Sequence, residues 1–315
     1  MSTLIVSTSY NDHARKAEHF LRAANHEVIR LNLDLANLGN SPLVATKSME
    51  QSVASSLGKH SLNKVHGVFV HHPIIEITPG YGIDLLDIAL CRASWINMID
   101  WIEQSLDRVL WVNKPSVIQP ASSSLHQLKV AEMSGLQTPA TIFTNDLSEV
   151  AAFAKEHDKL VIKPGNLIGL RTKGQRMLAR LVDVNVIDVQ ILEKAPCLFQ
   201  EYVEKSYEMR IHVIGHHVLA CKIDSQRSAK TRVDWRNYDL RNTPHETLEI
   251  DETLKDRCRT IVATLGLQMG ILDLICTPDN NIVFLECNAQ GHWIWIEELT
   301  GLPITKSLCE LFLDT

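Results

Sequence analysis

The segment 270–291, GILDLICTPDNNIVFLECNAQG, carries two acids and an amide at a spacing that suits a metal ion. Two apolar strands flank its Pro-Asp-Asn-Asn turn. A turn centred there places Asp273 directly opposite Glu286, with Asn288 on the same face. Buried carboxylates that face one another repel unless a cation lies between them. Because all the donors are oxygens, the trio predicts magnesium rather than zinc; the alternative is a solvent-facing edge with unrelated polar residues.

A second hairpin, 209–226, carries basic side chains in place of acids. With residues 215–217 as its loop, Arg210 is expected directly opposite Lys222. A polyanion between two facing cations relieves their repulsion, and a triphosphate has the required charge. Taken alone, both side chains would extend into water, as most Lys and Arg do. Together with the acidic hairpin, they predict a site for a nucleoside triphosphate and its metal ion.

The segment 231–236, TRVDWR, places two arginines on either side of an acid. Arg232 and Arg236 could bind a substrate carboxylate with paired hydrogen bonds, and an exposed basic loop is an equal alternative. Asp234 would then either orient one of these arginines or act as the base for a nucleophile.

Hydrophobic periodicity predicts the elements that position these side chains. The first third reads as an α/β unit with a parallel sheet, with strands at 4–8, 28–33, 65–71 and 109–112 and helices at 12–25 and 84–105. The middle reads as helices at 125–134 and 147–156 and strands at 140–144 and 160–163. Lys163 ends the last of these strands before Pro164 and Gly165, so its ammonium group can overhang a cleft. From residue 195 onward the chain is strand-rich, with one helix at 251–265 and a closing helix from about 306.

Bulk properties restrict the class of protein. A chain of 315 residues is expected to form about two to three structural units. Its net charge of −6 argues against nucleic-acid binding. The seven cysteines form no CxxC pair, which favours free thiols in a reducing compartment. Neither a signal peptide nor an apolar run of the roughly 20 residues that span a bilayer is present, so we expect a cytoplasmic protein without membrane contact.

The order of these residues resembles the ATP-grasp superfamily, from Lys163 through QEYVEKSYEMR at 200–210 to the ExN of Glu286 and Asn288. The resemblance implies an α/β (α+β) ATP-grasp fold with a Rossmann-like pre-ATP-grasp domain at 1–115, a small central lobe at 116–194 and a C-terminal lobe at 195–315. It implies that Lys163 binds phosphate, that 201–204 contact adenine through the backbone and that Glu208 holds the ribose. The complete implied ATP-binding set is Lys163, Gln200, Glu201, Tyr202, Val203, Glu204, Glu208, Arg210 and Lys222.

Within this superfamily the sequence is most similar to the ribosomal-peptide maturases of the microviridin, or graspetide, type. The similarity rests on WVNKP at 111–115, QLKVAEMSGLQTPATIFTND at 127–146, DWRNYDL at 234–240 and GHWIWIEELTGLPI at 291–304. Such enzymes phosphorylate an Asp or Glu side chain of a precursor peptide, and a Ser or Thr hydroxyl or a Lys amine then closes an ω-ester or ω-amide ring. The resemblance implies ATP, one or two Mg²⁺ ions, a precursor peptide with a leader segment and a homodimer. The implied catalytic set is Arg210, Lys222, Arg232, Asp234 and Arg236.

The chain departs from that family at two places. Ser124 stands where a lysine is common, and VHHPI at 70–74 replaces an aromatic-and-arginine motif of the first domain. Two alternatives therefore stay open: a ligase that joins free amino acids or small acids, and a nucleotide-binding module without catalysis. Ester and amide products are equally open.

Overall fold

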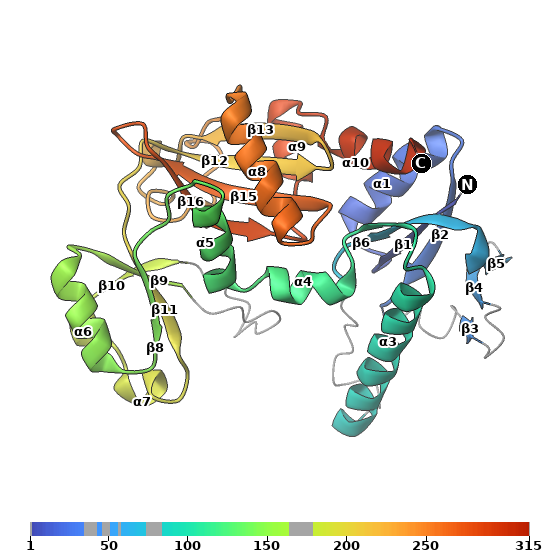
Figure 1. Cartoon of the computed structure of the whole chain (residues 1–315), viewed down its shortest axis with the longest axis horizontal. Helices are drawn as coiled ribbons and strands as arrows, with labels where there is room; N and C mark the ends of the chain where they lie inside the picture. Colours follow the sequence, from blue (N-terminus) through green and yellow to red (C-terminus); the bar gives the residue numbers. More distant parts are fainter. Residues whose placement is uncertain are drawn as a thin grey trace.

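The computed structural model describes residues 2–34, 43–45, 51–55, 58–73, 84–163 and 179–314. Within these residues the strands form four sheets. Figure 1 shows the N-terminal sheet at one end of an elongated molecule, a five-stranded sheet in the middle and a small sheet at the other end. Pro164 and Gly165, predicted to follow Lys163, and Ile74 of the VHHPI segment lie outside the described residues.

The N-terminal sheet is parallel, with strand order β2-β1-β6-β7. Its strands are β1 (Ser2–Ser7), β2 (Glu27–Asn32), β6 (Val65–Val70) and β7 (Leu110–Val112). Helix α1 (Asp12–Ala23) begins where the Asn11 side chain accepts the amide hydrogen of Ala14. The long helix α3 (Leu85–Ser105) projects away from the sheet (Figure 1). Strands β3 (Leu43–Ala45), β4 (Gln51–Ser55) and β5 (Gly58–Ser61) form a small antiparallel sheet of their own.

The sheet at the other end is antiparallel, with order β10-β9-β11-β8. It comprises β8 (Thr141–Thr144), β9 (Leu160–Lys163), β10 (Arg180–Val182) and β11 (Cys197–Glu201). Helices α6 (Leu147–Glu156) and α7 (Val189–Leu192) pack on one face, where Val150, Leu192 and Phe199 form the core. Because side chains alternate along a strand, Lys163 and Gln200 lie on the other face.

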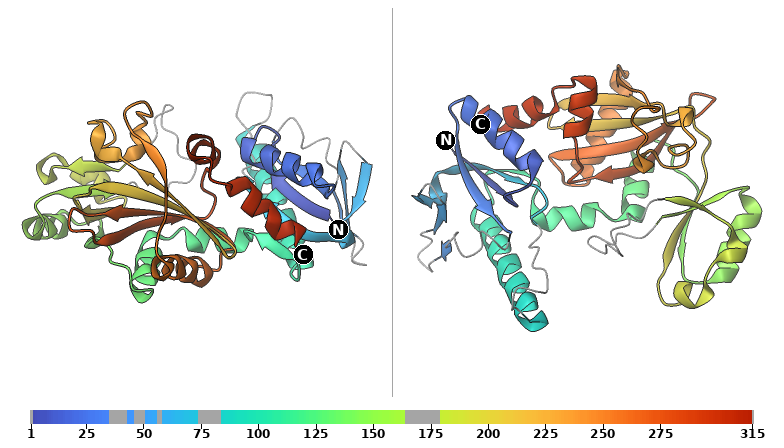
Figure 2. Two further views of the ribbon diagram at one scale, coloured as in Figure 1. Left: turned by 90° about the horizontal axis from the view of Figure 1, so that it is seen from above. Right: turned by 180° about the vertical axis from the view of Figure 1, so that it is seen from behind.

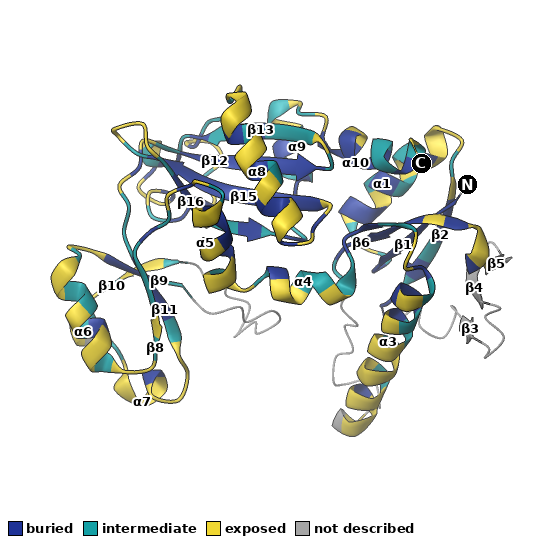
Figure 3. Cartoon of the chain, viewed as in Figure 1, coloured by how far each residue is buried: buried dark blue, intermediate teal, exposed yellow. Residues whose placement is uncertain are grey.

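The five-stranded sheet carries the predicted site. Its order is β14-β13-β12-β15-β16, all antiparallel, with β12 (Tyr207–Ile214), β13 (His217–Ile223), β14 (His245–Leu248), β15 (Met269–Cys276) and β16 (Ile282–Asn288). Helices α5 (Ser124–Met133) and α8 (Glu252–Thr264) cover one face through Leu128, Cys258 and Ile261. Strand β15 is buried along its whole length, as Figure 3 also shows.

The other face joins the two ends of the chain. Helix α10 (Ile304–Leu313) packs on α1, and its Phe312 meets Phe69 of β6. The same core includes Ile271 of β15 and Trp293, which is fully buried. Both termini therefore lie at the same end of the molecule, as the views in Figure 2 show. Helix α9 (Ile294–Thr300) precedes α10.

The structure confirms the α/β class and most predicted elements within one to four residues at their ends. It adds short elements that periodicity did not indicate: α4 (Pro115–Ala121), α7, α9, β10 and the three strands β3, β4 and β5. All seven cysteines are free. Among the described residues, no helix has both the length and the apolar character needed to cross a membrane. The domain boundaries at 115 and 194 stay a prediction.

Candidate nucleotide and metal site

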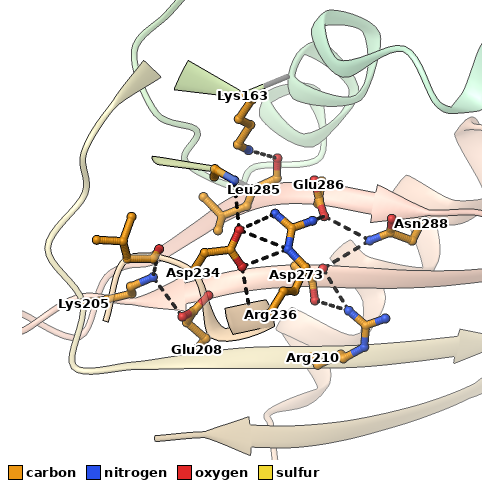
Figure 4. A network of polar contacts seen from close by, with 12 residues as sticks. Lys163, Lys205, Glu208, Arg210, Asp234, Arg236, Asp273, Leu285, Glu286 and Asn288 are labelled. Atoms are coloured by element: carbon orange, nitrogen blue, oxygen red, sulfur yellow. Dashed lines mark hydrogen bonds and ion pairs between the residues drawn. The ribbon is translucent and has the colours of Figure 1, made fainter. Parts of the chain in front are cut away.

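The acidic hairpin has the predicted register. Asp273 of β15 pairs with Glu286 of β16, and Asn288 pairs with Ile271 two positions along. The Asn288 Nδ2 atom lies 3.2 Å from Asp273 Oδ2 and 3.3 Å from Glu286 Oε1. An irregularity after Asp273 shifts the pairing by one residue toward the turn, so Leu274 faces Phe284. The three oxygen-bearing side chains therefore converge on one face of the sheet (Figure 4).

Two guanidinium groups balance the charge of these acids. Arg210 of the neighbouring strand β12 pairs with Asp273 of β15. The Arg210 Nη1 atom donates to Asp273 Oδ1 at 2.7 Å and to Asp273 Oδ2 at 3.0 Å. Arg236 Nη1 donates to Glu286 Oε1 at 3.2 Å. Arg210 and Asp273 are both buried. Each acid therefore has its own arginine partner, and the predicted metal ion between the two carboxylates stays a prediction.

Burial and charge move the two acids in opposite directions. Burial raises the pKa of Asp273 to about 6, against the pull of Arg210. Burial also opposes ionisation of Glu286, but Arg236 and Lys163 outweigh it and lower its pKa to about 2. Glu286 is thus held as a carboxylate by two cations on separate elements.

The predicted pairing of Arg210 with Lys222 is wrong. The turn between β12 and β13 contains only Gly215 and His216, so Arg210 faces Cys221 and Lys222 faces Met209. A register shift of one residue moves a side chain to the opposite face of a sheet. Lys222 consequently lies on the α5 and α8 side, with its Nζ 5.1 Å from the centre of the Tyr207 ring.

The TRVDWR segment at 231–236 reaches the site through one of its two arginines. Asp234 is buried and accepts hydrogen bonds from the backbone amide of Arg236 at 3.0 Å and from its Nε at 2.9 Å. Figure 4 shows the Arg236 guanidinium between Asp234 and Glu286. Of the two predicted functions for Asp234, its contacts favour orientation of an arginine. Arg232 is exposed, which agrees with the alternative prediction of an exposed basic loop for this residue.

The small sheet contributes Lys163 at the end of β9. Its Nζ donates to the backbone oxygen of Leu285 at 3.3 Å, directly before Glu286 (Figure 4). Burial lowers the pKa of Lys163, while Glu286 opposes that shift. Gln200, on the same face as Lys163, is buried and donates from Nε2 to Thr141 Oγ1 at 2.9 Å.

Residues 201–204 form the link between the small sheet and β12. Glu201 accepts the amide hydrogen of Ala140 at 2.9 Å, and the Tyr202 amide donates to the Lys159 backbone oxygen at 2.8 Å. Val203 is partly exposed and Glu204 is exposed. Side chains of this link therefore brace the backbone or face solvent, which fits a segment expected to contact adenine through its backbone.

Sequence reasoning did not identify the partner of Glu208. Lys205 Nζ donates to Glu208 Oε1 at 2.8 Å and to the Val233 backbone oxygen at 3.0 Å, and both side chains are buried. Burial raises the pKa of Glu208 against the pull of Lys205. Lys205 lies in a loop, where no periodicity indicates which way a side chain points.

An aromatic stack beneath Arg210 was also not predicted. Trp235 and Trp295 are stacked with ring centroids 5.0 Å apart. The Arg210 Cζ atom lies 5.1 Å from the centre of Trp235 and 5.9 Å from that of Trp295. Arg210 Nη2 also donates to the His292 backbone oxygen at 3.3 Å. Trp and Ile alternate at 293–296, but this alternation did not show which Trp would face the site.

The donor set suits a hard divalent cation. Oxygen atoms of Asp273, Glu286 and Asn288 are the ligand type that magnesium takes, and the Asn288 amide, whose Nδ2 faces both acids in this structure, would have to turn its oxygen toward the ion. In the part of the chain that the structure describes, no three His, Cys, Asp or Glu side chains form a metal-binding group. A metal here would therefore depend on the Asn288 amide as its third protein ligand.

Comparison with known proteins agrees with this geometry. Residues 172–312 match the family model of the RimK-like ATP-grasp domain. The chain is 24% identical over 173 residues to the glutathione synthetase of Anaplasma centrale, a match that spans 53% of this chain and 51% of that protein. The matched stretch thus spans about half the length of this curated relative.

Solved structures share the fold over almost the whole chain. A Chryseobacterium gregarium RiPP-associated ATP-grasp ligase, in complex with ADP and a leader and core peptide, has a TM-score of 0.85 at 23% identity and covers 99% of this chain and 96% of its own. The macrocyclase MdnC from Microcystis aeruginosa, bound to its precursor peptide MdnA, has a TM-score of 0.84 at 21% identity with 100% of both chains covered. The ligase PsnB with a phosphomimetic precursor variant, Mg and ADP has a TM-score of 0.80 at 18% identity and covers 100% and 98%.

The charged face between the two sheets is part of a fold that the chain shares with these ATP-grasp ligases. Residues 172–312 match the RimK-like ATP-grasp domain, in agreement with the order of the motifs in this part of the chain.

Proposed function

We propose that this protein is a peptide-modifying ATP-grasp ligase that activates Asp or Glu side chains of a precursor peptide and closes ω-ester or ω-amide crosslinks. One observation carries the proposal: Arg236, fixed by Asp234, presents its guanidinium beside Glu286 and Lys163. A pre-oriented guanidinium is the group that binds a carboxylate with paired hydrogen bonds. The DWR segment that supplies it is among the motifs that resemble graspetide maturases.

The proposed nucleotide site lies between the small sheet and the five-stranded sheet. Lys163 supplies the cation for phosphate from β9, and Arg210 supplies one from β12. Gln200, the 201–204 link and Glu208 line the expected base and ribose end. Lys222 lies on the opposite face and is not proposed as a ligand of ATP. Asp273, Glu286 and Asn288 would hold Mg²⁺, which neutralises phosphate charge when bound.

The chemistry proceeds in two transfers. An oxygen of the peptide carboxylate attacks the γ-phosphorus of ATP, the bond to the bridging oxygen breaks, and ADP leaves. A hydroxyl or amine of the same peptide then attacks the acyl carbon. The attacking group loses its proton, and inorganic phosphate departs as the leaving group. Arg236 is placed to hold the carboxylate in the first transfer and to offset the oxyanion charge in the second. The products are ADP, phosphate and a peptide that has lost one water for each crosslink.

The main alternative is a ligase for free amino acids or small acids. The partial match to a glutathione synthetase favours this alternative, because the name of that protein describes the synthesis of a small molecule. ADP release with small carboxylate–amine pairs, in the absence of any peptide, would select this alternative. A cytoplasmic location and a homodimer stay predictions beside either function.

The test uses the purified chain with ATP, Mg²⁺ and peptides encoded by short Thr-, Asp- and Glu-rich reading frames beside its gene. Intact mass is expected to show losses of whole waters, with ADP formed in equal number. A matched peptide with Asn and Gln in place of its acids should show neither. ADP release without any mass loss in the peptide would contradict the proposal.

A further inference from the structure

The loop 225–244 is strongly basic in an otherwise acidic protein. It contains Arg or Lys at five positions and Asp at two, a net charge of +3 (5 − 2), whereas the whole chain carries −6. Only Arg236 of these cations is committed to the site described above. The other four side chains are exposed at the surface: Arg227, Lys230, Arg232 and Arg241.

An open surface pocket, called the cavity below, lies at the base of this loop. This cavity has a volume of about 410 Å³ and is lined by Arg227, Ser228, Ala229, Arg241, Asn242 and Pro244. Arg227 makes one long contact with Asp224, at 4.0 Å, and its side chain is 66% exposed. Within the described residues, Arg241 takes part in no ion pair within 4.0 Å. Two guanidinium groups at one cavity are thus largely available to an anion.

The cavity is built on a fixed framework. The loop closes where the Asp224 amide donates to the Pro244 backbone oxygen at 3.0 Å. Thr231 Oγ1 donates to the Ser225 backbone oxygen at 2.8 Å and lies 3.2 Å from Thr243 Oγ1, with both Thr side chains buried.

One acid of the loop also serves this framework. Asp239 accepts hydrogen bonds from Ser228 Oγ at 2.7 Å and Asn242 Nδ2 at 3.0 Å. Those bonds lower the pKa of Asp239, with the Ser228 contact as the largest cause. Asp239 is therefore occupied by two lining side chains and pairs with neither arginine of the cavity.

The same loop reaches the reacting centre through its middle. The Val233 backbone oxygen accepts from Lys205, Arg236 donates to Glu286, and Trp235 is buried in the core beside Arg210. A peptide that lies along this loop would therefore have one carboxylate at Arg236 and others within reach of the exposed arginines.

We propose that the cavity at Arg227 and Arg241 is a second carboxylate subsite, which binds a neighbouring Asp or Glu of the acidic peptide and sets the register in which side chains reach Arg236. This inference rests on the proposed function and specifies how its substrate is held. Guanidinium groups bind carboxylates in a planar, two-bonded geometry, so two of them at one cavity select acidic side chains over amides.

The test compares two double variants of the full chain with the same net charge. Arg227→Gln with Arg241→Gln removes the subsite, and Lys155→Gln with Lys306→Gln removes two exposed charges on α6 and α10 as the matched control. The probe is a fluorescein-labelled peptide of alternating Glu and Thr, with its Gln-for-Glu counterpart, read by anisotropy in the presence of Mg²⁺ and ADP. Exposed ion pairs are weak, so we expect about a threefold loss of affinity for each arginine and about tenfold for both.

Three further readouts make the outcome decisive. Raising the salt concentration should weaken binding of the Glu peptide to the wild type more than to the double variant, which lacks two of the exposed charges that salt screens. ADP affinity should be equal in all proteins. An unchanged peptide affinity in the Arg227 and Arg241 variant, or an equal loss in the control, would overturn the inference. Preferential binding of a labelled single-stranded oligonucleotide of equal charge would assign the loop to nucleic acid and also overturn it.

The two proposals fail in different ways. If the wild type binds the Glu peptide through Arg227 and Arg241 but never removes water from any acidic peptide, the crosslinking function fails and the subsite stands. If crosslinks form at the same positions and rate in the double variant, the function stands and the subsite is refuted. If the wild type does not distinguish Glu from Gln peptides, the subsite is refuted whatever the activity.

Discussion

Gln127 of α5 holds both backbone polar atoms of Cys287, the residue between Glu286 and Asn288. Its Nε2 donates to the Cys287 oxygen at 2.7 Å, and its Oε1 accepts the Cys287 amide hydrogen at 3.0 Å. The Gln127 side chain and both backbone groups of Cys287 are buried, and the two residues lie 160 positions apart in the sequence. The predicted metal strand is thus fixed from the helix that covers the opposite face of its sheet.

Replacement of Gln127 by Met should therefore loosen the metal strand. Both backbone groups of Cys287 and the Ala121 oxygen, which also accepts from Gln127 Nε2, would lose this partner. At about 1–3 kcal/mol for each unsatisfied group, the free energy of unfolding in urea should fall by at least about 2 kcal/mol. Half-saturation by Mg²⁺ should move to higher concentration. Gln190→Met on α7, an exposed position, serves as control and should stay within about 0.5 kcal/mol of the wild type. Equal stability of the two variants would refute the role of the clamp.

Lys222 and Arg210 should respond differently to the same substitution. Arg210→Gln leaves Asp273 buried without its guanidinium partner, which costs about 3–5 kcal/mol in comparable buried pairs and should abolish ADP binding. Lys222→Gln changes a side chain on the other face of the sheet, so calorimetry should show ADP affinity within about twofold of the wild type. A large loss of ADP affinity in Lys222→Gln would show that Lys222 takes part in the nucleotide site although it lies on the other face of the sheet.

Arg236 and Arg232 form a matched pair for testing the acyl-transfer role. Arg236→Gln removes the cation oriented by Asp234, and we expect the rate of acyl phosphate formation, measured by hydroxylamine trapping, to fall about 10²–10³-fold. Arg236→Lys should recover only part of the rate because a single ammonium cannot make the paired bonds. Arg232→Gln, at an exposed position, should change this rate little. A comparable rate loss in both Gln variants would contradict the assignment.

Glu286→Gln tests the metal assignment while keeping the shape of the side chain. The neutral amide removes the charge that draws a divalent cation and also releases Arg236 and Lys163 from their common partner. Calorimetry should show that Mg²⁺ no longer raises the affinity for ADP, while ADP alone still binds. Glu298→Gln, at an exposed position of α9, is the control and should retain the Mg²⁺ effect. Undiminished product formation by Glu286→Gln would exclude Glu286 as a metal ligand.

Acid should destabilise the protein through its buried histidines. Burial, reinforced by Arg210, lowers the pKa of His212 to about 3 from its ordinary 6.5. The unfolded chain therefore takes up a proton that the folded chain does not, so stability is lost as pH falls from 6.5 toward 3. This residue alone should contribute up to about 1.4 kcal/mol per pH unit in that range. His212→Leu should flatten the dependence of unfolding free energy on pH, and His126→Leu, at an exposed position of α5, should not; identical slopes would contradict the expectation.

The sequence by itself determined the acidic hairpin. Alternation and a strong turn place Asp273 opposite Glu286 without knowledge of any other element, because a hairpin is a local structure with a fixed period of two. The order of motifs likewise predicted the ATP-grasp fold, which the chain shares with the solved structures. The same reasoning was wrong for Arg210 and Lys222, since one residue more or less in the turn exchanges the faces and His217 suits either assignment.

Only the tertiary structure decided what surrounds that hairpin. Three contacts of the site could not be read from periodicity: those of Gln127 on a helix, Lys205 in a loop and Trp295 on another helix. Each contact joins segments that are distant in the sequence or depends on the direction of a loop. Asp234 orients Arg236 and leaves Arg232 in solvent because a short turn, not a regular period, directs these side chains. Local periodicity fixes which side chains share a strand face, whereas packing between distant segments decides which charges meet there.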